Sequence, residues 1–191
     1  MKATGIVRRI DDLGRIVIPK EIRRTLRIRE TDPLEIYTEN TGEIVLKKYS
    51  PVGELSQFAR DYAESLAATT GQIICITDRE QIVAVSGTVK KDFMSKQITR
   101  QLEELIEQRM PLVASCNHDR YIQITDDSPI QAVSEAICPI ISEGDALGAV
   151  IMLAKDDKQS YSDTEKLLVS SAADFIGRQM GAKGIRSLYI T

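Results

Sequence analysis

The 191-residue sequence predicts two domains of different fold class, a small β-rich domain over residues 1–50 and a larger α+β domain over 54–180. Three observations predict this division. Short Ile- and Val-rich runs separated by turn-forming residues fill the first segment. Helical and strand-like periodicities alternate in the second segment. Basic residues concentrate in the first segment and acidic residues in the second, with 51–53 as a short linker and 181–191 as a tail.

The net charge of −3 is unevenly distributed along the chain. Residues 1–50 carry eleven Lys and Arg against eight Asp and Glu, whereas 51–191 carry fourteen against twenty. The two segments therefore differ in net charge, at +3 and −6, and residues 1–29 alone hold nine basic and three acidic residues. This asymmetry is typical of a basic module joined to an acidic one. The alternative is a locally basic surface that has no partner.

Four apolar runs in the first segment predict four short strands. The residues from Asp11 to Gly14 predict a turn between the first two strands, and Asn40 to Gly42 predict a hairpin loop between the last two. A short helix is expected after Pro19, because proline suits the first helical turn. The predicted order is β-β-α-β-β. The four runs are 5–10, 15–18, 33–37 and 43–49.

Basic side chains recur at helical spacing in this short helix. Arg8 and Arg15 bracket the first turn, so a hairpin would bring them near each other. Arginine has a planar fork of donors that suits phosphates and base edges. These cations form either one DNA-binding surface or a solvated helix face. The helix cations, at positions i, i+3, i+4 and i+7, are Lys20, Arg23, Arg24 and Arg27.

The first segment is also too small to form a stable core of its own. Fifty residues with strands of four to seven residues bury little apolar surface and leave sheet edges open. A second copy of the chain would close the sheet and double the basic surface. We therefore expect a homodimer formed through residues 1–50.

Four segments of this domain together resemble the swapped-hairpin domain of the AbrB family of transition-state regulators. The resemblance covers nearly all of 1–50 and implies a dimer whose hairpins interleave into one barrel that binds double-stranded DNA. By the family pattern, the DNA-contacting positions are Arg8, Arg15, Arg23 and Arg24. Further cations that would strengthen the field are Arg9, Lys20 and Arg27. The four segments are 4–9 (TGIVRR), 13–19 (LGRIVIP), 22–26 (IRRTL) and 44–49 (IVLKKY).

The second segment predicts an antiparallel sheet covered by helices, in the order α-β-β-α-β-β-β-α. A turn at 142–145 separates the last two strands, and the sequence from Ser162 to Glu165 has the pattern of a capping box that opens the last helix. The expected helices are 54–70, 90–110 and 162–180, and the expected strands are 72–77, 81–86, 121–125, 132–141 and 146–154.

This pattern resembles a GAF domain, and the strand–turn–strand of 137–153 carries most of the resemblance. The residues typical of cyclic-nucleotide-binding GAF domains are not evident, so no cofactor is expected. The resemblance implies a domain that senses an unidentified small molecule, joins subunits, or both. With this domain attached, the chain resembles regulators of sporulation genes in endospore-forming bacteria, which implies an activator and repressor of transcription.

Small residues recur every fourth position on the last helix, at Ala173, Gly177 and Gly181. Such a stripe lets two helix backbones approach closely. It would pack against the first helix of the same domain, or it would join two dimers into a homotetramer.

Two other classes of function remain as alternatives. One is an antitoxin-like interaction module, because related barrels neutralise toxins. The other is a cysteine-based redox enzyme, but Cys75 and Cys138 lie in strand-like runs typical of core residues. Cys116 lies in a polar loop with His118, which is more typical of a solvated turn than of a nucleophile and its base.

No catalytic residues and no metal ligands are expected, because the chain has one His and three widely spaced Cys. No apolar run is long enough to cross a membrane, and the N-terminus lacks the apolar core of a secretory leader. We therefore expect a cytoplasmic protein that has no membrane partner.

Overall fold

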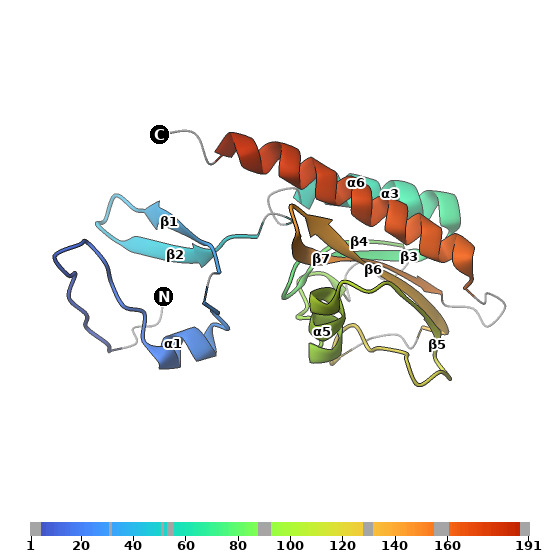
Figure 1. Cartoon of the computed structure of the whole chain (residues 1–191), viewed down its shortest axis with the longest axis horizontal. Helices are drawn as coiled ribbons and strands as arrows, with labels where there is room; N and C mark the ends of the chain where they lie inside the picture. The colour runs from blue at the N-terminus through green and yellow to red at the C-terminus, as the bar shows by residue number, and fades with distance from the viewer. Residues whose placement is uncertain are drawn as a thin grey trace. The chain divides into compact units, whose positions relative to one another are not determined.

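The structure, a computed structural model, describes residues 5–30, 32–50, 52, 56–87, 93–127, 132–154 and 161–187. The chain divides into two compact units, Met1–Tyr49 and Ser50–Thr191, and each is described by itself (Figure 1). Within the described residues, no helix is long and apolar enough to cross a membrane. In the same part of the chain, no group of three or more His, Cys, Asp or Glu side chains is placed to hold a metal ion.

The N-terminal unit contains one short helix and one hairpin. Helix α1 spans Lys20–Thr25 and begins directly after Pro19. Strands β1 (Leu34–Thr38) and β2 (Ile44–Lys48) pair antiparallel, and Gly42 has a φ of +84° in the turn that joins them. The predictions of this helix and of the last two strands are confirmed.

The first two predicted strands, 5–10 and 15–18, are not strands in the single chain, so this prediction is wrong for one copy. The predicted turn between them is present, because the Asp11 amide donates to the Arg15 carbonyl at 3.0 Å. The flanking segments are exposed, and Val7 reaches 90% exposure. The physical reason is size: a unit with a two-stranded sheet offers no neighbouring strands with which both segments can pair.

The C-terminal unit is an α+β fold built on a five-stranded antiparallel sheet of order β4-β3-β7-β6-β5. Helices α3 and α6 lie together on one face of this sheet and α5 lies on the other (Figure 1). The predicted order of helices and strands is confirmed. The elements are α3 (Ser56–Thr70), β3 (Ile73–Thr77), β4 (Ile82–Ser86), α5 (Arg100–Gln108), β5 (Leu112–Ser115), β6 (Ser134–Ser142), β7 (Asp145–Ala154) and α6 (Asp163–Ser187).

Helices cover both faces of the sheet, which explains why its strands are apolar at nearly every position. In β3, Ile74 and Ile76 pack toward α3 and α6, whereas Ile73 and Cys75 pack on the α5 side. Cys75 is fully buried, as expected of a core residue. At the start of α6, the Glu165 carboxylate accepts the amide hydrogen of Ser162 at 2.8 Å, which agrees with the predicted capping box.

Residues 90–92 of the helix expected over 90–110 lie outside the described residues, and within 93–110 the helix is shorter than expected, because α5 spans Arg100–Gln108. Ser95 has a φ of 62°, which interrupts any helix before that point. Thr99 then caps α5 by accepting the amide hydrogen of Leu102 at 3.3 Å. The amphipathic pattern of this region continued across a turn and so predicted too long a helix.

The strand expected over 121–125 is also wrong, and the third strand of the domain is β5 instead. Residues 121–125 attach to the rest of the domain without forming a ladder. The Ile122 amide donates to the side chain of Glu135 at 2.7 Å, and the Ile124 carbonyl accepts the amide hydrogen of Thr99 at 3.1 Å. Strand β5 pairs with β6 and was too short to predict from its four residues.

The small residues on α6 pack against β6 of their own domain. A Cβ atom at Gly177 would overlap the carbonyl oxygen of Ile141, and Ala173 is buried. The stripe therefore packs on β6 and not on the first helix of the domain, so the expectation of packing against that helix is wrong, while the expected role in a tetramer stays a prediction. Helix α6 continues to Ser187, through the first residues of the segment that was expected as a tail.

Glu135 is the largest polar side chain buried in the C-terminal unit as described. It lies on β6 beside Ile137, which faces the α5 side of the sheet. Its Oε1 accepts the Ile122 amide, but its Oε2 has no hydrogen-bond partner among the described residues, and neither has the hydroxyl of Thr125. Burial raises the pKa of Glu135 from 4.5 to about 8, although the Ile122 bond acts in the opposite direction.

We expect Gly177→Ala to lower the free energy of unfolding of the C-terminal unit by about 1–3 kcal/mol, because the added methyl meets a backbone atom of β6. The control is Gly181→Ala on the same helix, where the nearest atom is the side-chain oxygen of Ser142 at 3.3 Å, which can rotate away, and alanine raises helix propensity. Urea denaturation followed by circular dichroism measures both. Equal effects of the two substitutions would contradict this packing.

We expect the C-terminal unit to lose stability between pH 4.5 and about 8, because the native state holds the Glu135 proton that the unfolded chain has already released. The slope contributed by this group reaches at most about 1.4 kcal/mol per pH unit. In Glu135→Gln this contribution disappears, whereas the exposed control Glu64→Gln retains it. Urea denaturation at pH 5 and pH 8 measures the difference, and a Glu135→Gln variant with the wild-type pH dependence would refute it.

Candidate nucleic-acid interface

Helix α1 places two of the predicted DNA-contacting arginines. Arg24 is exposed, whereas Arg23 is half-buried, and its Nη1 lies 3.9 Å from a carboxylate oxygen of Glu30. Sequence spacing had identified Glu21 as the acidic residue of the helix and missed Glu30, which lies beyond the helix end. An exposed ion pair of this kind adds little stability.

Arg27 does not share the helix face with the other cations, so that part of the prediction is wrong. The helix ends at Thr25, and Arg27 follows in a left-handed conformation with a φ of 51°. The side chain of Lys48 donates a hydrogen bond to the Arg27 carbonyl, and its Nζ lies 3.6 Å from an Asp32 oxygen. These contacts connect the C-terminal end of α1 to β2. The cationic face of α1 is therefore confined to Lys20, Arg23 and Arg24.

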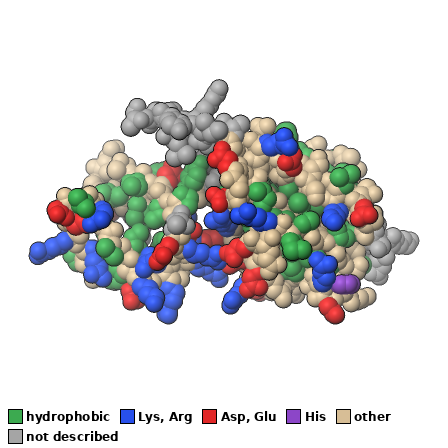
Figure 2. Space-filling model, viewed as in Figure 1, with side chains coloured by type: hydrophobic (Ala, Val, Ile, Leu, Met, Phe, Trp, Pro, Cys, Tyr) green, Lys and Arg blue, Asp and Glu red, His purple; other side chains and the backbone are tan. Residues whose placement is uncertain are grey.

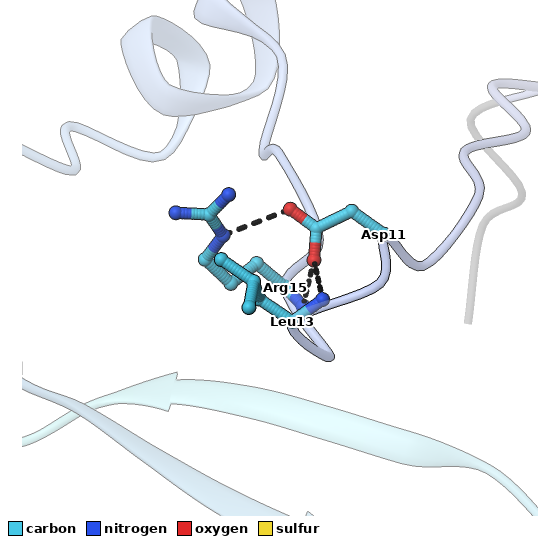
Figure 3. Close-up of polar contacts among 3 residues, drawn as sticks. All are labelled: Asp11, Leu13 and Arg15. Atoms are coloured by element: carbon cyan, nitrogen blue, oxygen red, sulfur yellow. Dashed lines mark hydrogen bonds and ion pairs between the residues drawn. The ribbon is translucent and has the colours of Figure 1, made fainter.

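The turn before α1 holds Arg15 by its own acidic residue (Figure 3). The Asp11 carboxylate accepts the amide hydrogens of Leu13 at 3.0 Å and Arg15 at 2.8 Å. It also accepts the Nε–H of Arg15 at 2.8 Å. The backbone and then the side-chain hydrogen bond from Arg15 lower the pKa of Asp11 from its usual 3.8, so the carboxylate is charged at neutral pH.

The fourth predicted contact, Arg8, is exposed on the segment before this turn, and its neighbour Arg9 is exposed as well. The predicted arginines therefore come from three places: the first segment, the 11–15 turn and α1. Figure 2 shows Lys and Arg side chains gathered mainly on the α1 side of the N-terminal unit. Sequence reasoning missed Asp11 as a functional residue and assigned it only to a turn. The signal was available, because an Asp that opens a tight turn four residues before an Arg can hold both.

The N-terminal unit also exposes an unusual amount of apolar side chain. Helix α1 buries none of its residues, and both the turn region and the hairpin carry exposed aliphatic side chains. Single exposed apolar residues are ordinary, but a set of this size in a unit of fifty residues marks an interaction surface. The exposed set is Ile6, Val7, Ile10, Leu13, Ile16, Val17, Leu26, Ile36, Tyr37, Ile44 and Leu46.

The residues considered for a redox site are arranged differently from a nucleophile and its base. Burial raises the pKa of Cys75 to about 12 and also raises that of Cys138, which disfavours the reactive thiolate in both. The Cys116 amide donates to Val133, and Nδ1 of His118 accepts the Arg120 amide hydrogen at 3.1 Å. This imidazole is a hydrogen-bonded part of the predicted turn.

Two family models match the chain, one in each unit. Residues 54–181 match the family described as stage V sporulation protein T C-terminal, transcription factor. Residues 7–54 match the family described as antidote-toxin recognition MazE, bacterial antitoxin.

The C-terminal unit also resembles solved GAF domains. The crystal structure of the GAF-B domain of DevS from Mycobacterium smegmatis aligns with a TM-score of 0.57 and 15% identity, over 73% of this chain and 99% of that one. The likeness confirms the predicted GAF fold and concerns the fold alone.

Two curated relatives come from Bacillus subtilis (strain 168). The transition state regulatory protein AbrB is 63% identical over 51 residues, which are 27% of this chain and 52% of that relative. This similarity confirms the resemblance found in residues 1–50. Stage V sporulation protein T is 48% identical over 180 residues, which are 94% of this chain and 99% of the relative. The chain therefore belongs to the stage V sporulation protein T family of transcription factors.

Proposed function

We propose that the chain is a DNA-binding regulator of sporulation genes that docks a dimer of its N-terminal unit on double-stranded DNA. The observation that carries this proposal is the pairing, in one small unit, of a cationic surface with a large exposed apolar one. The apolar surface supports association with a second copy, and the cations support contact with phosphates. Membership of a transcription-factor family agrees with both roles.

The dimer would supply what one chain lacks. Residues 5–10 and 15–18 gain sheet partners when they interleave with the same segments of a second copy, and their exposed side chains gain a core. The dimer then carries two copies of Arg8, Arg15, Arg23 and Arg24. Contacts from these arginines position the dimer on DNA, and DNA shape adds selectivity. Whether a gene is activated or repressed would depend on where the dimer binds relative to the promoter. The protein would act in the cytoplasm, where the bacterial chromosome lies.

The C-terminal unit would join two such dimers into a tetramer through the outer surface of α3 and α6. The support is an aromatic cluster that these two helices share. The small residues of α6 give no such support, because Gly177 lies against β6. The ring centroids of Phe58 and Tyr62 on α3 lie 5.7 and 5.6 Å from that of Phe175 on α6. Phe175 remains 41% exposed although it is a large aromatic residue. Aromatic residues in such positions are typical of the centre of protein interfaces.

A small-molecule ligand of the GAF-like unit would bind on the α5 side of the sheet. The support is the pair of buried polar atoms without partners among the described residues, Oε2 of Glu135 and the hydroxyl of Thr125. Buried polar atoms of proteins are nearly always hydrogen-bonded, to protein, water or ligand. A ligand with a hydrogen-bond acceptor for the protonated Glu135 carboxyl, a polar group for the Thr125 hydroxyl and an apolar body would suit this region and the aliphatic residues around it.

A second candidate function is toxin neutralisation, which the match of residues 7–54 to an antitoxin family favours. Antitoxins of this type typically use a short flexible tail after the barrel. Here the chain continues into a folded sheet with helices on both faces. Co-purification with a small toxin would support this alternative.

We expect DNA binding to weaken steeply with salt. If each subunit neutralises about four phosphates, the slope of log K against log salt for the dimer is roughly −7. Arg24→Gln removes one such contact per subunit and should reduce the slope by about 2 without dissociating the dimer. The control, Arg100→Gln, removes the same charge from the C-terminal unit and should leave the slope unchanged. Fluorescence anisotropy between 50 and 300 mM KCl measures the slopes, and salt-independent binding would exclude this mechanism.

We expect Phe175→Glu to convert the tetramer into a dimer, because a charge placed in the aromatic cluster opposes burial of that surface. The matched control is Met110→Glu, which changes an exposed apolar residue outside α3 and α6. Analytical ultracentrifugation measures the mass of both variants. An unchanged mass for a folded Phe175→Glu variant would count against this interface.

A further inference from the structure

The two oxygens of the Asp11 carboxylate serve different partners in the turn before α1 (Figure 3). Oδ1 accepts the amide hydrogens of Leu13 and Arg15, and thereby holds the backbone of the turn. Oδ2 accepts the Nε–H of Arg15 at 2.8 Å, and thereby holds the guanidinium. One carboxylate therefore fixes both the backbone position of Arg15 and the direction of its side chain.

The bond through Nε leaves the outer edge of the Arg15 guanidinium available. In Figure 3 the two terminal nitrogens carry no contact to Asp11 and point away from it. In the described part of the chain, Nη1 and Nη2 make no hydrogen bond, and the side chain is 69% exposed. A guanidinium held by its inner nitrogen keeps the paired outer donors for a bidentate contact.

The position of this acid is unfavourable if Arg15 acts only as a positive charge. Asp11 is ionised at neutral pH, because its bonds with Arg15 lower its pKa. A fixed negative charge beside an arginine reduces its attraction for phosphates. The carboxylate offsets that loss only if the orientation it imposes on Arg15 matters for binding.

We propose that Asp11 is a positioning residue that aims the Arg15 fork at the edge of a DNA base, so that Arg15 determines sequence selectivity. The inference rests on the proposed DNA-binding function and names the role of one residue pair within it. A base edge in the major groove accepts two parallel hydrogen bonds in one orientation, whereas attraction to phosphates is largely independent of orientation. An arginine that is already oriented also loses less side-chain entropy on binding.

The test compares Asp11→Asn with Asp12→Asn. Both substitutions remove one negative charge from the same exposed turn, but only Asp11 contacts Arg15. Asparagine at position 11 keeps an oxygen for the two backbone amides and replaces the oxygen that accepts Nε–H with a donor. The loop is therefore retained while the guanidinium loses its support, and the amide NMR signals of Leu13 and Arg15 verify this.

Binding is measured for two duplexes of equal length, one selected by the wild-type protein from random-sequence DNA and one unselected. We expect Asp12→Asn to bind both duplexes more tightly, because it only adds net positive charge. Asp11→Asn should lose about tenfold in affinity for the selected duplex and none for the unselected one. In an Arg15→Gln background, Asp11→Asn should have no further effect on selectivity.

Three results would overturn the inference: Asp11→Asn tightening binding to both duplexes as Asp12→Asn does, an unchanged ratio between the duplexes, or an equal effect with Arg15 absent. The last result would show that Asp11→Asn acts by disturbing the turn as a whole and not through Arg15. If the wild-type protein binds neither duplex, the proposed function itself fails, which is a different outcome from the failure of this residue pair.

Discussion

The burial of apolar side chains in the N-terminal unit is the constraint on which the rest of the structure depends. One copy of this unit contains a six-residue helix and a two-stranded hairpin, and its helix buries no residue. Aliphatic side chains such as Val7 and Val17 stay in water, although each would gain about 1.5–3 kcal/mol from full burial. A second copy relieves this cost, and the same association brings two sets of arginines into one assembly. We therefore propose that one association both buries these side chains and assembles the DNA-binding surface.

The C-terminal unit meets the same requirement within one chain, which frees its outer surface for other roles. Helices on both faces of the five-stranded sheet bury its strands, and the absence of a side chain at Gly177 lets α6 lie directly on β6. Two side chains of this unit are therefore not explained by the packing of its core. Phe175 is a large aromatic side chain that stays 41% exposed, and Glu135 is a fully buried acid. The exposure of Phe175 supports the proposed contact with a partner chain, and the burial of Glu135 supports the proposed ligand site.

Sequence periodicity predicted most of this architecture because most of its elements bury a face within their own chain. The long helix α3 and the hairpin of β6 and β7 follow from local patterns, since their apolar spacing matches their burial. Prediction failed where the apolar pattern of a segment does not match the contacts that the segment makes. Residues 121–125 are apolar like a strand but bond to a side chain, Glu135, and Ser95 interrupts a helical pattern that continues on both sides of it. The strands expected at 5–10 and 15–18 need a partner that one sequence copy does not contain.

The candidate site could be predicted for its cations but not for the acids that hold them. Charge counting treats Asp11 and Glu30 as a subtraction from the basic surface, whereas each lies within 4 Å of an arginine expected to contact DNA. In both pairs the arginine remains at the surface, but only Asp11 holds its arginine by a hydrogen bond, because the contact of Arg23 with the exposed Glu30 spans 3.9 Å. Among the described residues, neither Arg8 nor Arg24 forms such an ion pair, which fits the proposal that these two side chains contact phosphates. We therefore propose that the same unit combines cations that attract the DNA backbone with one arginine, Arg15, whose direction is fixed, and that Arg15 reads a sequence because its geometry exists before DNA arrives.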